Sequence, residues 1–141
     1  MLPPLSHSLI DAMPEGFASK VAPEPFQRPR LMGWNAELAT ELGLVMSEVE
    51  QARIFSGHLP PEVQTFATVY AGHQFGHYVP QLGDGRALLL GEMSTAEGAA
   101  WELQLKGSGI TPYSRFGDGR AVWRSSIREY LASEALHALG I

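Results

Sequence analysis

The stretch WELQLKGSGITPYSRFGDGRAVWRSSIREYLASEALHALGI, residues 101–141, decides the fold of this chain. Its first six residues, WELQLK, alternate between apolar and polar side chains, which is typical of a half-buried strand. After a loop that contains GSGITP, residues 120–139 are predicted to form one long helix. Gly140 is expected to end that helix in the left-handed conformation.

A second strand is expected just upstream, at residues 86–92 (RALLLGE), because this short apolar run is bounded by glycine-rich sequence. The small and polar residues 93–100 between the two strands predict an antiparallel hairpin. Residues 65–78 are apolar but interrupted by Gly72 and Gly76, and the pattern leaves strand and helix open there. The sequence therefore predicts an α+β fold, a small antiparallel sheet packed by one long helix.

The first part of the chain differs in character from the rest. Residues 1–33 contain six prolines and are predicted to form an extended arm that lies over the domain without contributing a core element. Asn35 has the features of an N-cap for a short helix at residues 36–42, which Gly43 is expected to end. Residues 34–141 are predicted to form the folded domain.

Composition narrows the class of protein. The hydrophobic fraction of 45% and the charged fraction of 18% are ordinary for a globular protein, and no run reaches the ~18 apolar residues that span a bilayer. The absence of cysteine excludes a disulfide framework and thiolate metal ligands. The opening residues have no basic or sustained apolar segment of the secretory type, so a cytoplasmic location is expected. A net charge of −5 disfavours a nucleic-acid partner.

Positive charge is concentrated in one short stretch of this acidic chain. Between Leu103 and Arg128, five basic residues stand against a single acid, Asp118. Such a concentration indicates either a local anion site, for example a phosphate pocket, or a solvated basic face of a helix. Charge alone leaves both interpretations open.

Two similar turns lie before and after the two predicted strands, QLGDGR at residues 81–86 and RFGDGR at residues 115–120. Glycines let backbone N–H groups approach a phosphate closely, and Arg86 adds a forked pair of donors. Asp118 is a candidate N-cap for the long helix, whose first turn would offer free N–H groups to an anion. Each turn alone is also ordinary hairpin or capping chemistry. The occurrence of two such turns around one lysine favours an anion site.

That lysine is Lys106, which ends the predicted strand at residues 101–106, about twenty residues after the first turn, and precedes the long helix. In kinase-like proteins, a strand lysine contacts the phosphates of ATP and is held by a glutamate from the following helix. The alternative is a solvated lysine at a strand end. On a helical wheel Glu134 falls on the apparent core face with Trp123 and Leu131, so the pattern by itself favours Glu134 over Glu129 as the partner.

His73 and His77 have the i, i+4 spacing that places two metal ligands on one face of a helix. Gly72 and Gly76 argue against a helix, and no third ligand stands nearby in the sequence. No metal site is therefore expected in this chain.

Residues 70–92 (YAGHQFGHYVPQLGDGRALLLGE) and 101–141 closely resemble the selenoprotein O family. The likeness is tight over residues 66–141 and looser over PEGF and RLMGWNAELATELGL. The resemblance implies the N-lobe portion of a protein-kinase-like fold that binds ATP in a flipped orientation and transfers AMP to hydroxyl-bearing side chains of proteins. It implies nucleotide-contacting roles for Gly83, Gly85, Arg86, Lys106, Asp118 and Gly119, with Glu129 as the partner of Lys106.

The same resemblance places the catalytic base and the metal-binding Asp and Asn further along the chain. The present residues are thus expected to be the N-terminal part of a longer protein that uses ATP and Mg²⁺, and to be inactive alone. Catalytic residues and metal ligands are not expected among them. Two rival functions stay open: a kinase-like phosphotransferase, and a non-catalytic, nucleotide-sensing pseudokinase module.

Overall fold

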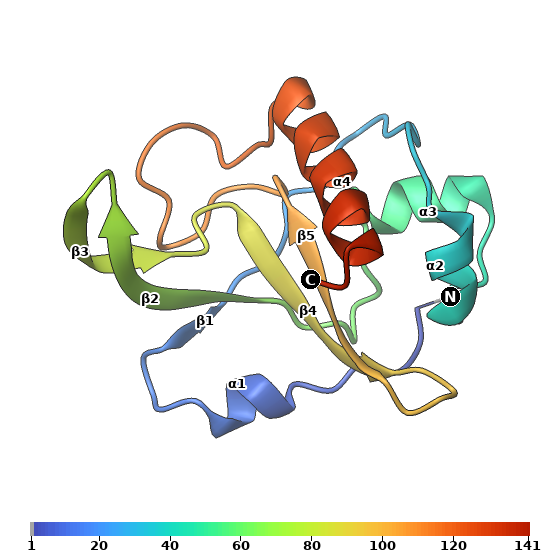
Figure 1. The fold of residues 1–141 in the computed structure, drawn as a ribbon, viewed down its shortest axis with the longest axis horizontal. Coiled ribbons are helices and arrows are strands. Elements are labelled where there is room, and N and C mark those ends of the chain that lie inside the picture. Colours follow the sequence, from blue (N-terminus) through green and yellow to red (C-terminus); the bar gives the residue numbers. More distant parts are fainter. Residues whose placement is uncertain (1) are drawn as a thin grey trace.

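The computed structural model describes residues 2–141 and has an α+β architecture, one antiparallel sheet with four helices around it (Figure 1). In chain order the elements are α1 (Ser8–Ala12), β1 (Ala18–Lys20), α2 (Ala36–Glu41), α3 (Glu48–Ile54), β2 (Phe66–Gln74), β3 (His77–Gly83), β4 (Ala87–Ser94), β5 (Ala100–Lys106) and α4 (Trp123–Ala138). The predicted class and the small antiparallel sheet are confirmed. Across residues 2–141, every helix is too short or too polar to cross a membrane.

The sheet has the strand order β1-β2-β4-β5, and β3 pairs with the far half of β2. β4 and β5 form the predicted hairpin, with Leu88 opposite Leu105 and Ser94 opposite Ala100. Exposure alternates along most of β5, and Leu105 is buried. The hairpin and the alternating strand that the sequence predicted are both confirmed.

The segment that the sequence left undecided forms the second hairpin, β2–β3. Phe75 and Gly76 make its turn with φ values of 51° and 80°. Two consecutive positive φ values give the turn whose twist matches that of the flanking strands. His73 and His77 therefore lie on neighbouring strands, and the ring of His73 packs against Tyr78 instead. Within residues 2–141, no group of three or more His, Cys, Asp or Glu residues is placed to hold a metal ion.

The first 33 residues are more integral to the fold than the sequence predicted. Ser8–Ala12 form α1, Ala18–Lys20 join the sheet as β1, and Leu2 is buried in the core. The expectation of a wholly extended arm without core residues is therefore corrected. All six prolines of this segment lie outside α1 and β1, so none of them interrupts either element.

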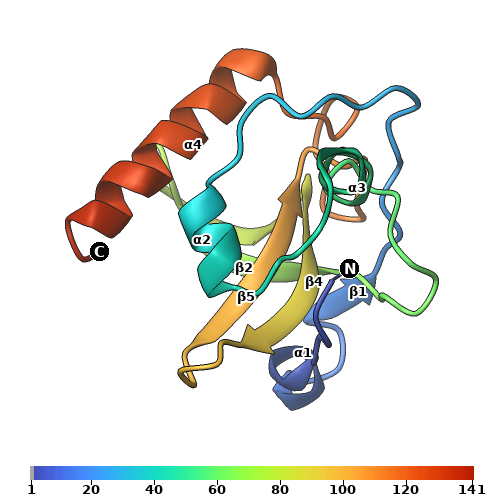
Figure 2. The ribbon, with the colours of Figure 1, turned by 90° about the vertical axis from the view of Figure 1, so that its right-hand side faces the viewer.

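The core lies between the β4–β5 hairpin and the segment that contains α2 and α3 (Figure 2). Its buried members are Leu2, Ala39, Leu42, Leu44, Leu90, Met93 and Leu105. As predicted, Asn35 caps α2, because its Oδ1 accepts a hydrogen bond from the N–H of Leu38, and Gly43 follows the helix with φ of 65°. These caps fix α2 against the sheet.

The long helix α4 begins later than the sequence predicted. Its N-cap is Val122, whose apolar side chain cannot accept a hydrogen bond, so the expectation of Asp118 as the N-cap is wrong. Asp118 Oδ1 instead accepts a hydrogen bond from the N–H of Arg120 at 3.0 Å. Arg120 forms an isolated antiparallel bridge with Ser108, which keeps it extended and delays the first helical turn. Gly140 follows the helix with φ of 76°, as expected.

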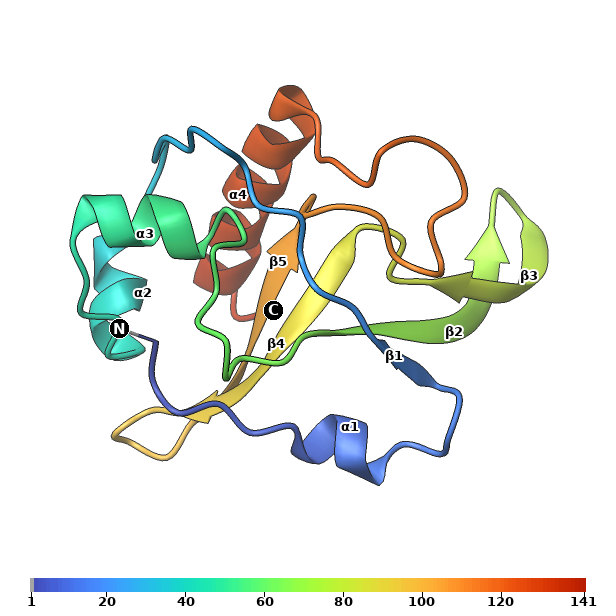
Figure 3. The ribbon, with the colours of Figure 1, turned by 180° about the vertical axis from the view of Figure 1, so that it is seen from behind.

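The apolar face of α4 is not a core face. All of α4 is described, and none of its residues is buried; Trp123 and Leu131 are 58% and 61% exposed. Figure 3 shows α4 on the far side of β5 from the viewer. Polar contacts attach the helix: both carboxylate oxygens of Glu134 lie 2.9 Å from Nδ2 of Asn35, and Glu129 pairs with Lys106. The apolar residues that share a face with Glu134 on the helical wheel are therefore exposed, contrary to the prediction of a core face.

Candidate functional site

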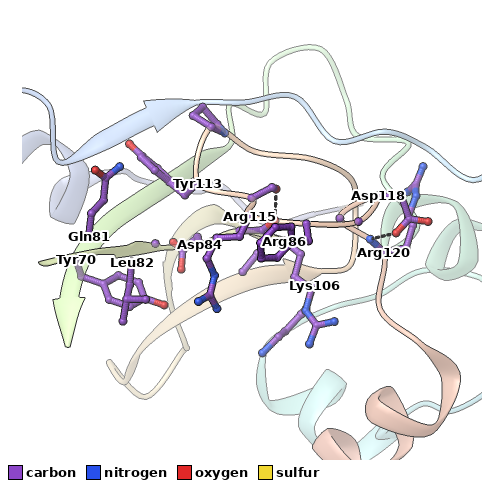
Figure 4. Close-up of a pocket in the computed structure, with 18 of the residues that line it drawn as sticks. Tyr70, Gln81, Leu82, Asp84, Arg86, Lys106, Tyr113, Arg115, Asp118 and Arg120 are labelled. Carbon is purple, nitrogen blue, oxygen red and sulfur yellow. Dashed lines mark hydrogen bonds between the residues drawn. The ribbon is translucent and has the colours of Figure 1, made fainter. Parts of the chain in front are cut away.

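A pocket of about 990 Å³ opens where the end of β3, the start of β4 and the end of β5 meet the loop before α4 (Figure 4). Six of the seven predicted residues line it: Gly83, Gly85, Arg86, Lys106, Asp118 and Gly119. In Figure 4 Asp84 and Asp118, one from each GDGR turn, lie on opposite sides of Lys106. The tertiary structure therefore brings into one pocket two turns that are about thirty residues apart in the sequence.

The seventh residue, Glu129, does not line the pocket but contacts Lys106. Nζ of Lys106 is 3.0 Å from Oε2 of Glu129, and the two side chains are 51% and 47% exposed. Glu134, the alternative partner, is instead bound to Asn35. The helical wheel favoured Glu134 because it assumed that the apolar side of α4 faces the core. The structure selects Glu129, the acid that the family resemblance implied.

The glycines of the first turn are required by the loop that packs on it. A side chain at Gly83 would place its Cβ 2.7 Å from the side chain of Tyr113, and one at Gly85 would reach 3.1 Å from the Tyr113 carbonyl oxygen. The hydroxyl of Ser114 also donates to the carbonyl of Gly85. These two positions thus require glycine because the loop packs closely on them, and both glycines also line the pocket. The sequence reasoning missed Tyr113, which no local pattern singled out.

The acid of the first turn has a structural task. Oδ2 of Asp84 accepts hydrogen bonds from the N–H of Thr68 at 2.8 Å and from its hydroxyl at 2.7 Å. The carbonyl of Asp84 accepts a further bond from the hydroxyl of Thr111. Asp84 therefore ties the turn to β2 and to the following loop, which fixes the position of the neighbouring Arg86.

Arg86 is the cation most available to a ligand. Within residues 2–141, its guanidinium has no hydrogen-bond or ion-pair partner, although it lines the pocket. Arg115 also lines the pocket, but its Nη1 donates to Oε1 of Gln74 at 2.9 Å. A forked guanidinium without a protein partner suits a phosphate or carboxylate ligand.

The charge of the pocket wall favours an anionic ligand. Arg86, Lys106, Arg115 and Arg120 contribute positive charge, against the carboxylates of Asp84 and Asp118. Both carboxylates already accept hydrogen bonds from the protein. The donor set therefore fits a phosphorylated ligand, whereas no set of metal ligands is present among residues 2–141.

The fold and the pocket define an α+β domain with a cationic pocket suited to a phosphorylated ligand. A family model described as protein adenylyltransferase SelO matches residues 5–141, and the chain belongs to this family. The resemblance read from the sequence is thereby confirmed.

Curated relatives named protein nucleotidyltransferase YdiU match most of the chain. That of Aeromonas hydrophila is 62% identical over 123 residues, which are 86% of this chain and 26% of the relative. That of Bordetella petrii is 57% identical over 134 residues, and that of Thioalkalivibrio sulfidiphilus 55% over 133, each covering 92% of this chain and 27% of the relative. The chain thus spans about a quarter of the length of these relatives.

Proposed function

We propose that this chain is the ATP-binding part of a protein adenylyltransferase, which transfers AMP from ATP to Ser, Thr or Tyr hydroxyls of other proteins. The observation that carries the proposal is the Lys106–Glu129 ion pair at the edge of a pocket walled by two GDGR turns. The names of the family and of its curated relatives support the transfer of a nucleotidyl group. The cytoplasm is the proposed location.

We propose further that the chain forms the N-lobe portion of a kinase-like fold. The elements follow one another in the order used by protein kinases: a glycine turn, a strand, a hairpin, a strand with a terminal lysine, and a helix with a paired glutamate. In this proposal Lys106 and Arg86 donate to phosphate oxygens, and Glu129 keeps Lys106 oriented. Asp118, Gly119, Gly83 and Gly85 form the walls that position the nucleotide.

In the proposed reaction, the hydroxyl oxygen of the substrate attacks the α-phosphorus of ATP. A new O–P bond forms, the bond from the α-phosphorus to the bridging oxygen breaks, and pyrophosphate leaves while the hydroxyl proton passes to a base. Mg²⁺, when bound, supplies the neutralisation of phosphate charge that such transfers need. The family resemblance places the base and the metal ligands outside this chain, so we expect these residues alone to bind nucleotide without turnover.

The test uses the full-length parent protein with Mg²⁺, and compares ATP labelled at the α-phosphate with ATP labelled at the γ-phosphate. Label on protein from the α position alone supports adenylyl transfer. Label from the γ position makes the protein a kinase, and label from neither favours a nucleotide-sensing module.

Lys106→Ala is the decisive variant in this assay, and Lys20→Ala is its matched control. Lys20 also ends a strand, β1, but it does not line the pocket. We expect loss of ATP binding and transfer in Lys106→Ala and wild-type behaviour in Lys20→Ala. Equal behaviour of the two variants would remove Lys106 from the nucleotide site.

A further inference from the structure

We propose that Arg120 is a positioning residue that clamps the second GDGR turn to the N-terminal arm, so that Glu24 and Phe26 hold Asp118 and Gly119 in place for the nucleotide. The inference rests on the proposed function, because it concerns the same pocket. It assigns the arm a part in nucleotide binding although neither Glu24 nor Phe26 lines the pocket.

Three contacts hold the side chain of Arg120 on the arm. Nη1 donates to the carbonyl oxygen of Glu24 at 2.7 Å, and Nη2 lies 3.3 Å from Oε2 of the same residue. The guanidinium carbon lies 4.3 Å from the centroid of the Phe26 ring, within cation–π distance. With its side chain only 25% exposed, Arg120 is held from two sides.

The backbone of Arg120 holds the turn itself. Its N–H donates to Oδ1 of Asp118 at 3.0 Å, the bond drawn dashed in Figure 4. Next to it, the carbonyl of Gly119 accepts a hydrogen bond from the N–H of Gly109 at 3.3 Å. One residue therefore links the arm, through its side chain, to the proposed nucleotide contacts, through its backbone.

The segment that follows Lys106 completes the clamp. The N–H of Glu24 donates to the carbonyl of Ser108 at 2.7 Å, and Ser108 also bridges Arg120. The arm, residues 107–109 and the second turn are therefore joined by backbone pairing. Because Lys106 immediately precedes this contact, the clamp also constrains the end of β5.

The fit between these segments leaves no room for side chains. A Cβ at Gly119 would lie 1.9 Å from the carbonyl oxygen of Gly109, and one at Gly107 would lie 2.5 Å from Cβ of Ala121. The GSG sequence at residues 107–109 thus serves a close backbone contact. Such a contact transmits a displacement of the arm to the turn, because neither backbone can give way without the other.

Arg120 differs in this respect from Arg86, although both line the pocket. The guanidinium of Arg86 has no partner within residues 2–141, whereas that of Arg120 is occupied by Glu24 and Phe26. Arg86 is therefore placed to bind the ligand, and Arg120 to shape the wall.

The test measures ATP affinity and AMP-transfer kinetics of the full-length parent with Mg²⁺ in Phe26→Ala, Arg120→Ala and Arg120→Lys. Phe26→Ala is the critical variant, because it removes a contact of the clamp from outside the pocket. We expect KM for ATP to rise about tenfold in Arg120→Ala and about threefold in Phe26→Ala, with kcat at saturating ATP within about twofold of wild type. Arg120→Lys keeps the charge, so its KM for ATP is expected to rise less than that of Arg120→Ala.

Arg53→Ala is the matched control, since Arg53 is an exposed arginine in the last turn of α3 that does not line the pocket. Its KM and kcat are expected to equal those of wild type. The clamp would be overturned if the KM of Phe26→Ala equalled that of wild type. It would also be overturned if KM rose equally in Arg120→Lys and Arg120→Ala. A fall in kcat without a change in KM would also overturn it.

Hydrogen exchange without nucleotide separates this inference from the proposed function. The amide of Gly109, which bonds to Gly119, is expected to exchange faster in Phe26→Ala than in wild type. Unchanged exchange would overturn the clamp even if ATP binds. If wild type binds no ATP, the proposed function fails, and the proposal that the clamp serves nucleotide binding fails with it.

Discussion

Nζ of Lys106 lies 3.0 Å from Oε2 of Glu129, which joins the end of β5 to the middle of α4. The same helix is tied to Asn35 through Glu134, about 1.4 turns after Glu129. α4 buries none of its own residues, and it is held by these two acids together with the packing of His137 against Trp101 of β5. The position of α4 and the orientation of Lys106 are therefore coupled.

Glu129→Gln is expected to lower activity far more than stability. The ion pair is half exposed on both sides, so its loss should change the free energy of unfolding by no more than about 1 kcal/mol. A released Lys106 no longer points reliably into the pocket, and AMP transfer by the full-length parent should fall about tenfold or more. Label transfer from α-labelled ATP and thermal unfolding measure the two effects. A large loss of stability with normal transfer would contradict this role.

Asn35→Asp is expected to destabilise the attachment of α4 while preserving the cap of α2. Asp caps helices as well as Asn does, but a carboxylate at this position would face the carboxylate of Glu134 in place of the amide Nδ2. We expect a loss of about 2 kcal/mol in the free energy of unfolding, measured by urea denaturation of the full-length parent. The double variant Asn35→Asp, Glu134→Gln should recover most of it. If the double variant were no better than the single one, repulsion would not be the cause.

Gly119→Ala and Gly117→Ala form a matched pair, because both glycines have positive φ, 68° and 85°. A Cβ at Gly119 would lie 1.9 Å from the carbonyl oxygen of Gly109, whereas one at Gly117 would meet nothing within 4 Å. Gly117→Ala should lower the free energy of unfolding by only the ~1–2 kcal/mol that the left-handed conformation costs an alanine. Gly119→Ala should cost more and also weaken ATP binding. Equal losses of stability would show that conformation, and not contact with residue 109, is what the glycine serves.

Glu92→Gln is expected to loosen the N-terminal arm in a pH-dependent way. The carboxylate of Glu92 accepts hydrogen bonds from the hydroxyl of Ser8, from the hydroxyl of Ser6 at 3.0 Å and from the N–H of Leu9 at 2.9 Å. These bonds, that of the Ser8 hydroxyl above all, lower the pKa of Glu92 and outweigh its desolvation.

A carboxyl whose pKa is lower in the folded than in the unfolded protein stabilises the fold above its unfolded pKa, and this stabilisation is lost as the pH falls through its folded pKa. The difference in melting temperature between wild type and Glu92→Gln should therefore be full at neutral pH and shrink below pH 4.5, the ordinary pKa of the group. Thermal unfolding of the full-length parent across this range measures it. A difference that grows on acidification would contradict the assigned role.

The sequence by itself determined the elements that depend on neighbouring residues. Alternation in WELQLK predicted β5, Asn35 and Gly43 predicted the ends of α2, and Gly140 predicted the end of α4. These features are local, because side-chain periodicity and caps act within a few residues. The two GDGR turns and Lys106 were also identified as candidates from sequence, and six of the seven predicted site residues line one pocket.

Only the tertiary structure decided what depends on contacts between distant segments. Glu129, and not Glu134, pairs with Lys106, because Asn35 binds Glu134 from ninety-nine residues away. Asp118 fails to cap α4 because Ser108 keeps Arg120 extended. The arm contributes a strand and a buried leucine through contacts with β2 and β4, which lie far along the chain. Local pattern cannot carry this information, since the free energy of such contacts belongs to pairs of residues that only folding brings together.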